Sequence, residues 1–384
     1  MEEVITLIFG YKNRETIRVK RCLDSLDAQR NKNFRVLFVD YGSNSQLSSS
    51  VKKLVNSYSF SHYIYVDARG WVWNRSHALN IGIRLVETSY IMTTDVDLIF
   101  SPDFINDFIE ELSGNIELHS SAFSLPKNFE LWEKLSKTHS VKFKPREMTA
   151  LGLVQATDTD VLHEIRGFDE NYSIWGVEDF DLNSRLEIKG YKTKWLDLYI
   201  TPVFHQWHPN SGGRSRGNLP GGWHKMMIDY CEQNINKISR NNLGWGKSPK
   251  KGERKILNLL NQRERDKINT LDLTGRPVNS SINVLIHNIN KLAQDETLRV
   301  IYKDVRLKDI KASKLHSLIK FANKISDKLN LPILLVSDLV YYKNYEDVFD
   351  MKDMMMYFIF ENKNHISDYY FEETTDRMEL IIEK

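Results

Sequence analysis

The chain has 384 residues, with 53 Lys and Arg residues against 51 Asp and Glu residues and a formal net charge of +2. This near balance argues against wholesale binding to nucleic acid, and the length accommodates two or three domains. The two cysteines are not spaced as metal ligands, and one disulfide could not stabilise so long a chain. So few cysteines are typical of proteins in a reducing cytoplasm. Because no apolar run approaches the ~20 residues of a membrane span, we expect a soluble, cytoplasmic protein.

Short apolar runs alternate with helical patterns over the first hundred residues. We expect strands at residues 4–9, 34–39, 62–66 and 91–100. Between the first two runs, one face of a helix is formed by residues at i, i+3, i+4 and i+7, which are Val19, Cys22, Leu23 and Leu26. Residues 47–55 and the stretch around Ala78 are expected to be helical as well. Strands that alternate with helices predict crossover units and a mostly parallel α/β sheet.

The stretch 91–100, IMTTDVDLIF, is expected to be one buried strand that carries two carboxylates near its end. Alternate side chains of a strand share a face, so Asp95 and Asp97 should point the same way. Two neighbouring carboxylates repel each other, and Mg²⁺ or Mn²⁺ would bind them because these cations prefer carboxylate oxygens. The alternative is that the two aspartates only cap the helix that follows.

Further charged residues follow the ends of the other predicted strands: Lys12, Arg14, Asp40 and Asp67. Open parallel sheets bind ligands beyond the carboxyl ends of their strands, so these side chains should converge on one site. Acidic and basic groups together at such an edge indicate a nucleotide and its phosphates. Solvated loop charge is the alternative interpretation.

Asn74 and Arg75 stand at the start of the next predicted helix. Amide donors and the positive end of the helix dipole favour an anion there, such as a phosphate group. Ordinary helix capping by Asn74 or Ser76 explains the same residues equally well.

A second group of acidic residues opens the helix that is expected to end at Lys189 and Gly190. Glu178, Asp179 and Asp181 occupy its first turn, where the helix dipole favours negative charge and would keep a general base ionised. Trp175, just before them, offers a flat face to a sugar ring. The alternative is that these acids only stabilise the helix terminus.

The segment 199–210 carries two histidines at the end of a predicted strand, His205 and His208. A glycine-rich loop with Arg214 and Arg216 follows. A histidine beside such a loop is a candidate metal ligand, and the loop could close over a diphosphate and exclude water. The alternative is that the loop is only a linker.

In their order along the chain, these motifs resemble those of the inverting, metal-dependent glycosyltransferases of the GT-A fold. The resemblance covers roughly residues 4–216 and is to family 2 and to the β-1,4-galactosyltransferase and N-acetylgalactosaminyltransferase groups. Asp95-Val96-Asp97 is similar to the family's metal-binding motif, and the segment that ends at Asp179 is similar to its acceptor-side motif. Val177 stands where the galactosyltransferases usually have glycine, which leaves the sugar open.

The resemblance implies a role for each candidate residue. Asp97 and His205 would hold Mn²⁺ or Mg²⁺, with Asp95 in support and His208 as the alternative histidine ligand. Asp179 would be the catalytic base, with Glu178 beside it. The donor, a UDP-sugar, would be bound by the remaining candidates, which are Lys12, Arg14, Asp40, Asp67, Asn74, Arg75, Asp95, Trp175, Arg214 and Arg216.

The implied activity is transfer of a sugar of the galactose, N-acetylgalactosamine or glucose type from a UDP-sugar to a glycan hydroxyl, as in the synthesis of a surface polysaccharide. One alternative acceptor is a Ser, Thr or Cys side chain of a peptide. An alternative of another class is a catalytically silent scaffold that binds sugar nucleotides. The complete set of acids and histidine favours an enzyme.

Composition divides the chain into three parts. Residues 1–246 form the expected GT-A catalytic domain, 247–280 a basic connector, and 281–384 a small α/β domain in which we find no catalytic constellation. That last domain could bind the acceptor, a partner enzyme or a second subunit. We expect a cytoplasmic location, with peripheral attachment to the inner face of the membrane as a further option.

Overall fold

The computed structural model describes residues 4–130, 135, 142–146, 151–208, 220, 222–249, 252–260, 262–303, 348–374 and 377–384. The chain forms two compact units, Met1–Gly212 with Gly222–Lys251, and Gly213–Gly221 with Gly252–Lys384. The predicted connector at 247–280 is therefore not a separate segment. Most of it folds with the second unit, because strand β12 (Asn269–Asp272) pairs with β13 (Thr297–Lys303).

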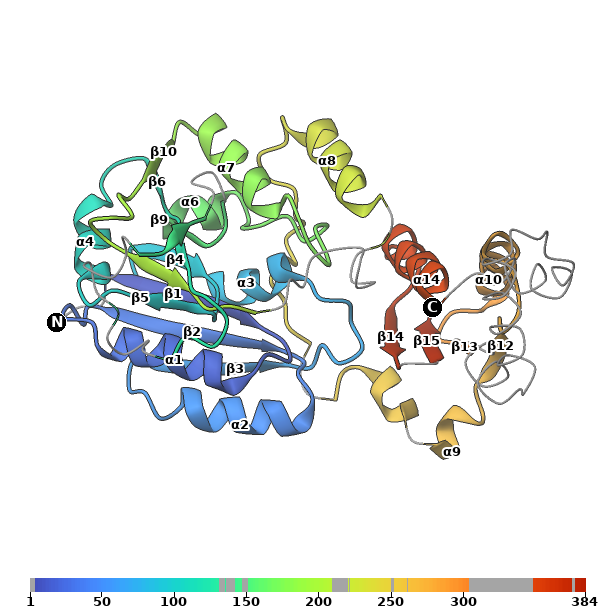
Figure 1. Cartoon of the computed structure of the whole chain (residues 1–384). Coiled ribbons are helices and arrows are strands. Elements are labelled where there is room, and N and C mark those ends of the chain that lie inside the picture. Colours follow the sequence, from blue (N-terminus) through green and yellow to red (C-terminus); the bar gives the residue numbers. More distant parts are fainter. Residues whose placement is uncertain are drawn as a thin grey trace, which may run out of the picture. The chain divides into compact units, whose positions relative to one another are not determined.

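The first unit is built on a seven-stranded sheet of order β10-β6-β9-β4-β1-β2-β3 (Figure 1). Its strands are β1 (Ile5–Tyr11), β2 (Phe34–Tyr41), β3 (Ser61–Val66), β4 (Tyr90–Thr94), β6 (Ile116–Ser120), β9 (Val154–Asp158) and β10 (Lys192–Trp195). All neighbours are parallel except β9, which is antiparallel to β4 and β6. The predicted α/β class with a mostly parallel sheet is confirmed.

Helices cover both faces of this sheet. Ile5, Leu7 and Phe9 of β1 pack into one core with α1 (Thr16–Asp27), α2 (Ser45–Val55) and α4 (Phe104–Glu111). Ile8 points to the opposite core, which is formed with α3 (Arg75–Ile83), α6 (Thr159–Glu164) and α7 (Glu178–Ile188). Burial on both faces explains why β1 and β2 are largely apolar in sequence rather than alternating, whereas the edge strand β3 is partly exposed.

The expectation of one strand over 91–100 is wrong. β4 ends at Thr94, and β5 (Leu98–Phe100) belongs to a second, four-stranded sheet of order β5-β11-β7-β8. The other strands of this sheet are β7 (Phe123–Ser124), β8 (Lys144–Pro145) and β11 (Val203–His205). The chain turns between β4 and β5 because β5 leaves the large sheet to pair antiparallel with β11. Asp95 and Asp97 consequently lie in a turn and not on one face of a strand.

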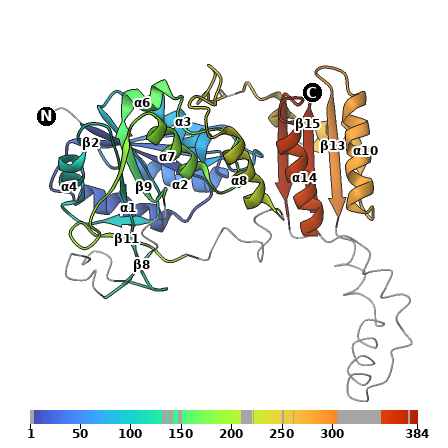
Figure 2. The same ribbon diagram turned by 90° about the horizontal axis from the view of Figure 1, so that it is seen from above.

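The second unit has a four-stranded sheet of order β12-β13-β15-β14, with β14 at Asp368–Glu373 and β15 at Arg377–Glu383. Helices α10 (Val278–Lys291) and α14 (Val348–Asn362) run alongside its strands (Figure 2). The shorter η3 (Lys255–Leu260) and α9 (Gln262–Arg265) precede β12. This confirms the expected small α/β part. Among the helices that the structure describes, none is long and apolar enough to cross a membrane.

Candidate active site

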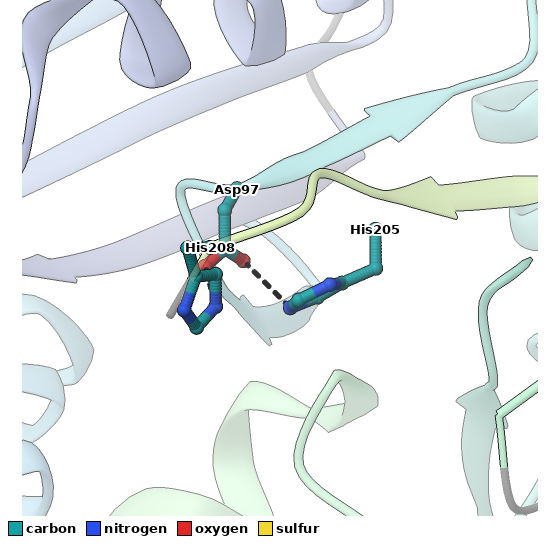
Figure 3. Close-up of side chains that lie close together, drawn as sticks. All are labelled: Asp97, His205 and His208. Carbon is teal, nitrogen blue, oxygen red and sulfur yellow. Dashed lines mark ion pairs between the residues drawn. The ribbon is translucent and has the colours of Figure 1, made fainter. Parts of the chain in front are cut away.

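Asp97, His205 and His208 come together beside the second sheet (Figure 3). His205 Nε2 lies 3.6 Å from Asp97 Oδ1, and His208 Nε2 lies 3.1 Å from Asp97 Oδ2. The pairing of β5 with β11 produces this arrangement, since it places His205 opposite Leu98, the residue after Asp97. One carboxylate and two imidazoles thus converge, with ligand atoms that all lie within 4.8 Å of one another.

The chemistry of these three side chains fits a divalent cation. Asp97 Oδ1 is buried and has no hydrogen-bond partner within the described part of the chain, so an ion would satisfy it. Burial lowers the pKa of His205 to about 4, which keeps its imidazole neutral at neutral pH. Metal binding requires neutral imidazoles and an ionised carboxylate. A mixed carboxylate and imidazole set suits Mn²⁺ better than Mg²⁺, which prefers oxygen ligands alone.

Asp95, the other aspartate of the turn, lies outside this cluster and faces Arg75 instead. Arg75 Nε is 3.6 Å from Asp95 Oδ1. Burial and the neighbouring carboxylates of Asp97 and Asp179 raise the pKa of Asp95, while the guanidinium of Arg75 opposes them. The two carboxylates of the turn therefore have different partners. Asp97 contacts the two histidines, and Asp95 faces Arg75, the first residue of α3.

Asp179, the predicted catalytic base, is the second residue of α7 and is reached by the same arginine. Arg75 Nη1 donates to Asp179 Oδ1 at 2.7 Å, and Arg75 Nη2 donates to the carbonyl of Gly152 at 2.8 Å. The side chain of Asp179 is 20% exposed. It is thus accessible to a substrate while its Oδ1 accepts the hydrogen bond from Arg75. Sequence reasoning missed Gly152, which carries no recognisable motif.

Glu178 takes a different position although it is the neighbour of Asp179. Its carboxylate is buried and accepts a hydrogen bond from the Gly176 N–H at 3.0 Å. Burial and the charge of Asp179 raise the pKa of Glu178 to about 7. Of the two predicted catalytic residues, Asp179 is therefore the one that lies open to a substrate, and Glu178 supports the loop before α7.

The raised pKa of Glu178 predicts a pH-dependent effect of Glu178→Gln. The folded protein binds this proton more tightly than the unfolded chain, so the stability of the wild type should fall as the pH rises from about 4.5 to about 7. Gln keeps the hydrogen-bonding shape without the buried charge. At pH 8 the variant should exceed the wild type in free energy of unfolding by on the order of 1–3 kcal/mol, and at pH 5 by much less.

Urea unfolding followed by tryptophan fluorescence measures this difference for the first unit alone, since all eight tryptophans fall within it. Glu187→Gln, on the exposed side of the same helix, is the matched control and should show no such pH dependence. An equal effect of Glu178→Gln at both pH values would contradict the assignment of a buried, strained carboxylate.

A groove of about 600 Å³ opens beside Asp179. Trp175, Val177 and Phe180 line one side, and His224 and Ile228 of α8 (Trp223–Asn234) line the other. Trp175 is 51% exposed, and its ring centroid lies 5.3 Å from that of His224. An exposed aromatic face beside a carboxylate is a suitable place for a sugar ring. The contribution of α8 was not visible in the sequence, because nothing there relates His224 to Trp175.

Asp40 and Asn74, which were predicted to bind the nucleotide, make hydrogen bonds within the fold. Asp40 is fully buried; its Oδ1 accepts from the Ser43 N–H at 2.9 Å and its Oδ2 from the Tyr63 hydroxyl at 2.7 Å. Asn74 caps α3 by accepting from the His77 N–H at 2.8 Å, which is the alternative that the sequence left open. Both residues shape the edge of the sheet and have few hydrogen-bonding positions left for a ligand.

The other predicted nucleotide-binding residues ring the ends of β1 and β3. Lys12 Nζ donates to the carbonyl of Trp71 at 2.7 Å and so ties the two loops together. Arg14 is exposed. Asp67 is held by both Nε and Nη2 of Arg69, at 2.7 and 3.0 Å, a partner that sequence reasoning did not single out. Arg214 and Arg216 lie outside the described residues.

The sequence of this region matches two families. Residues 8–151 match the family described as "Glycosyl transferase family 2", and residues 134–209 match the one described as "N-terminal domain of galactosyltransferase". Together the two matches span every described residue of the Asp97, His205 and His208 cluster and of the Arg75, Gly152 and Asp179 contacts.

One curated relative is the teichoic acid poly(glycerol phosphate) polymerase of Staphylococcus epidermidis. It is 24% identical over 209 residues, which are 52% of this chain and 28% of that protein. This chain thus spans less than a third of the relative's length.

Two solved structures have similar but distant folds. A mannosyltransferase from Pyrobaculum calidifontis, in complex with GDP-Man and Mn²⁺, has 17% identity and a TM-score of 0.40, with 65% of this chain and 66% of that chain covered. TarS from S. aureus has 16% identity and a TM-score of 0.41, with 54% and 37% covered.

Proposed function

We propose that the first unit, whose residues 8–151 match glycosyltransferase family 2, transfers a hexose from a UDP-sugar to a hydroxyl group of a glycan, with inversion at the anomeric carbon. The observation that carries the proposal is the Asp97, His205 and His208 cluster, in which the buried Oδ1 of Asp97 accepts no hydrogen bond from the described residues. Asp179 supplies the second requirement, an accessible carboxylate on the groove side.

Separate residues act on the donor and on the acceptor. Asp97, His205 and His208 would hold Mn²⁺, and a bound divalent cation stabilises negative charge on a leaving diphosphate. Asp179 accepts the proton of the acceptor hydroxyl as that oxygen bonds to the anomeric carbon. The bond from the anomeric carbon to the diphosphate oxygen breaks, and UDP leaves with the electron pair. One displacement inverts the centre, so a single carboxylate base is sufficient.

Trp175 and the groove beside α8 serve the acceptor. The exposed indole face packs against the apolar face of a sugar ring and leaves the ring hydroxyls free to reach Asp179. A polymer of the cell surface is the class of acceptor that we propose. The relationship to a teichoic acid polymerase supports that class, although the match covers only part of that relative.

Nucleotide release tests the proposal. The whole chain is incubated with UDP-Glc, UDP-Gal, UDP-GlcNAc, UDP-GalNAc and GDP-Man, each with Mn²⁺, with EDTA, and with Mn²⁺ added back after EDTA. We expect UDP release from at least one UDP-sugar, its loss with EDTA and its recovery with Mn²⁺. Release from GDP-Man alone would contradict the proposed donor, and UDP binding without release in the presence of any acceptor would indicate a silent scaffold.

Acceptor identity needs a second set of reactions with the active donor. Neutral oligosaccharides, a poly(glycerol phosphate) oligomer and Ser/Thr-containing peptides are compared at equal concentration. Transfer to a peptide in preference to either glycan class would overturn the proposed acceptor while leaving the transferase assignment intact.

A further inference from the structure

Arg75 lies where four separate segments of the first unit meet. It is the first residue of α3, and it contacts the turn after β4, the residue two positions before β9 and the first turn of α7. Its side chain is only 15% exposed. Each nitrogen of the guanidinium faces a different oxygen: Nη1 that of Asp179, Nη2 that of Gly152, and Nε that of Asp95.

The charges around Arg75 argue against a role as a phosphate ligand. One guanidinium faces two carboxylates, those of Asp179 and Asp95, so the local sum is negative before any nucleotide binds. A diphosphate approaching this group would meet net repulsion. The planar, forked donors of arginine do suit a different task, which is to fix the direction of a carboxylate.

The main chain of Gly152 packs against the Asp179 carboxylate on the side of Oδ2. A Cβ added at Gly152 would lie 1.9 Å from Asp179 Oδ2 and 2.3 Å from its Cγ, and the residue has φ of +92°. Only glycine allows the backbone to approach the carboxylate this closely while keeping that conformation. Asp179 is thus held between a guanidinium and a bare main chain, which leaves it little freedom to rotate.

The geometry points to Arg75 as a positioning residue that orients Asp179 for proton transfer and ties it, through Asp95, to the turn that presents Asp97. Gly152 is the second part of this clamp. The inference rests on the proposed function, since it assumes that Asp179 is the base. It assigns Arg75 to the base and the metal-binding turn rather than to the diphosphate.

Loss of the clamp should change how Asp179 is presented to the acceptor, and not how tightly the nucleotide binds. Arg75 Nη1 holds one oxygen of the Asp179 carboxylate, and Arg75 Nε faces Asp95. Without the guanidinium, this oxygen loses its hydrogen-bond donor and the carboxylate is free to leave the position that proton transfer requires.

The test compares Arg75→Gln and Arg75→Lys by kcat, by KM and by UDP binding with Mn²⁺. For Arg75→Gln we expect kcat to fall by about 100-fold because the base is misplaced. The KM for the donor and the UDP affinity should change little. Arg75→Lys keeps the charge without the fork, so it should restore kcat only in part.

Arg84→Gln is the matched control for loss of a guanidinium. Arg84 caps the same helix and donates to the carbonyl of Trp245 at 2.6 Å, away from the groove, so its variant should keep the wild-type kcat. A role of Arg75 in folding alone would lower the melting temperature and would reduce kcat and UDP binding to the same extent, and that result would overturn the inference.

Gly152→Ala tests the second part of the clamp without altering any charge. Gly190, at the other end of α7, has φ of +87° and no atom within 4 Å of an added Cβ, so Gly190→Ala carries the same kind of backbone strain without the clash. We expect Gly152→Ala to lower kcat by about 10- to 100-fold and Gly190→Ala to leave it unchanged. Equal kcat in both variants would contradict the clamp.

These results separate the clamp from the proposed function. If UDP affinity collapses in Arg75→Gln at an unchanged melting temperature, Arg75 is a diphosphate ligand and the clamp is wrong, while the transferase remains. If Asp179→Asn retains turnover, Asp179 is not the base, and the proposed mechanism fails whatever Arg75 does.

Discussion

Asp97→Asn should remove metal-dependent transfer almost completely. The substitution keeps the size of the side chain but takes the negative charge from the only carboxylate in the described cluster with His205 and His208. Changes to groups that merely support metal ligands already cost 10- to 100-fold in affinity, so loss of a direct ligand should weaken Mn²⁺ binding by at least about 100-fold. Calorimetric titration with Mn²⁺ in the presence of UDP measures this directly.

Asp95→Asn provides the comparison for that titration. Asp95 belongs to the same turn but faces Arg75, so its variant should retain much more of the Mn²⁺ affinity than Asp97→Asn. His205→Ala and His208→Ala should each weaken Mn²⁺ binding, since both Nε2 atoms face Asp97. An unchanged Mn²⁺ titration in one histidine variant would remove that histidine from the ligand set. Equal losses of Mn²⁺ affinity in Asp95→Asn and Asp97→Asn would contradict the assignment of Asp97, and not Asp95, as the metal ligand.

Asp179→Asn should reduce kcat by about 10²- to 10⁴-fold, the usual contribution of a general base. Asn can still accept the hydrogen bond from Arg75 Nη1, so the fold around the groove should be preserved. UDP affinity with Mn²⁺ should be close to that of the wild type, because Asp179 lies with Trp175 in the groove that we propose for the acceptor. Steady-state kinetics and UDP binding on the same preparation measure both quantities.

Glu187→Gln is the control for this substitution, because Glu187 lies on the same helix and is exposed. It should leave both kcat and UDP affinity unchanged. Loss of UDP binding in Asp179→Asn would place this residue on the donor side and would contradict its assignment as the base.

Hydrophobic periodicity was sufficient to predict several elements of the first unit. The runs at 4–9, 34–39 and 62–66 correspond to β1, β2 and β3, and α1 carries the one-face pattern of Val19, Cys22, Leu23 and Leu26. These predictions succeed because β1 and β2 are largely buried on both faces and α1 is buried on one, so their apolar residues follow a local sequence pattern. The acids of α7 could be placed in its first turn for the same reason, since the dipole effect is local.

Predictions about partners depended on contacts between distant segments. Arg75 reads as a phosphate-binding residue when only its place at a helix start is known, whereas in the structure its partners are 77 and 104 residues away, at Gly152 and Asp179. Asp40 likewise reads as a free carboxylate at a strand end, yet Tyr63 of the neighbouring strand occupies one of its oxygens. Neither partner leaves a signal in a single sequence.

The sequence by itself determined the α/β class, the helix that carries Asp179 and the candidates Asp97, His205 and His208, because each depends on local pattern or on motif order. Only the tertiary structure decided that 91–100 is broken into two strands, that both histidines face Asp97, and that Asp95 and Asp179 share one arginine. The physical reason is that β5 pairs with β11 across a hundred residues of chain. Which strands pair, and therefore which side chains meet, is set by packing of the whole unit rather than by any one stretch of residues.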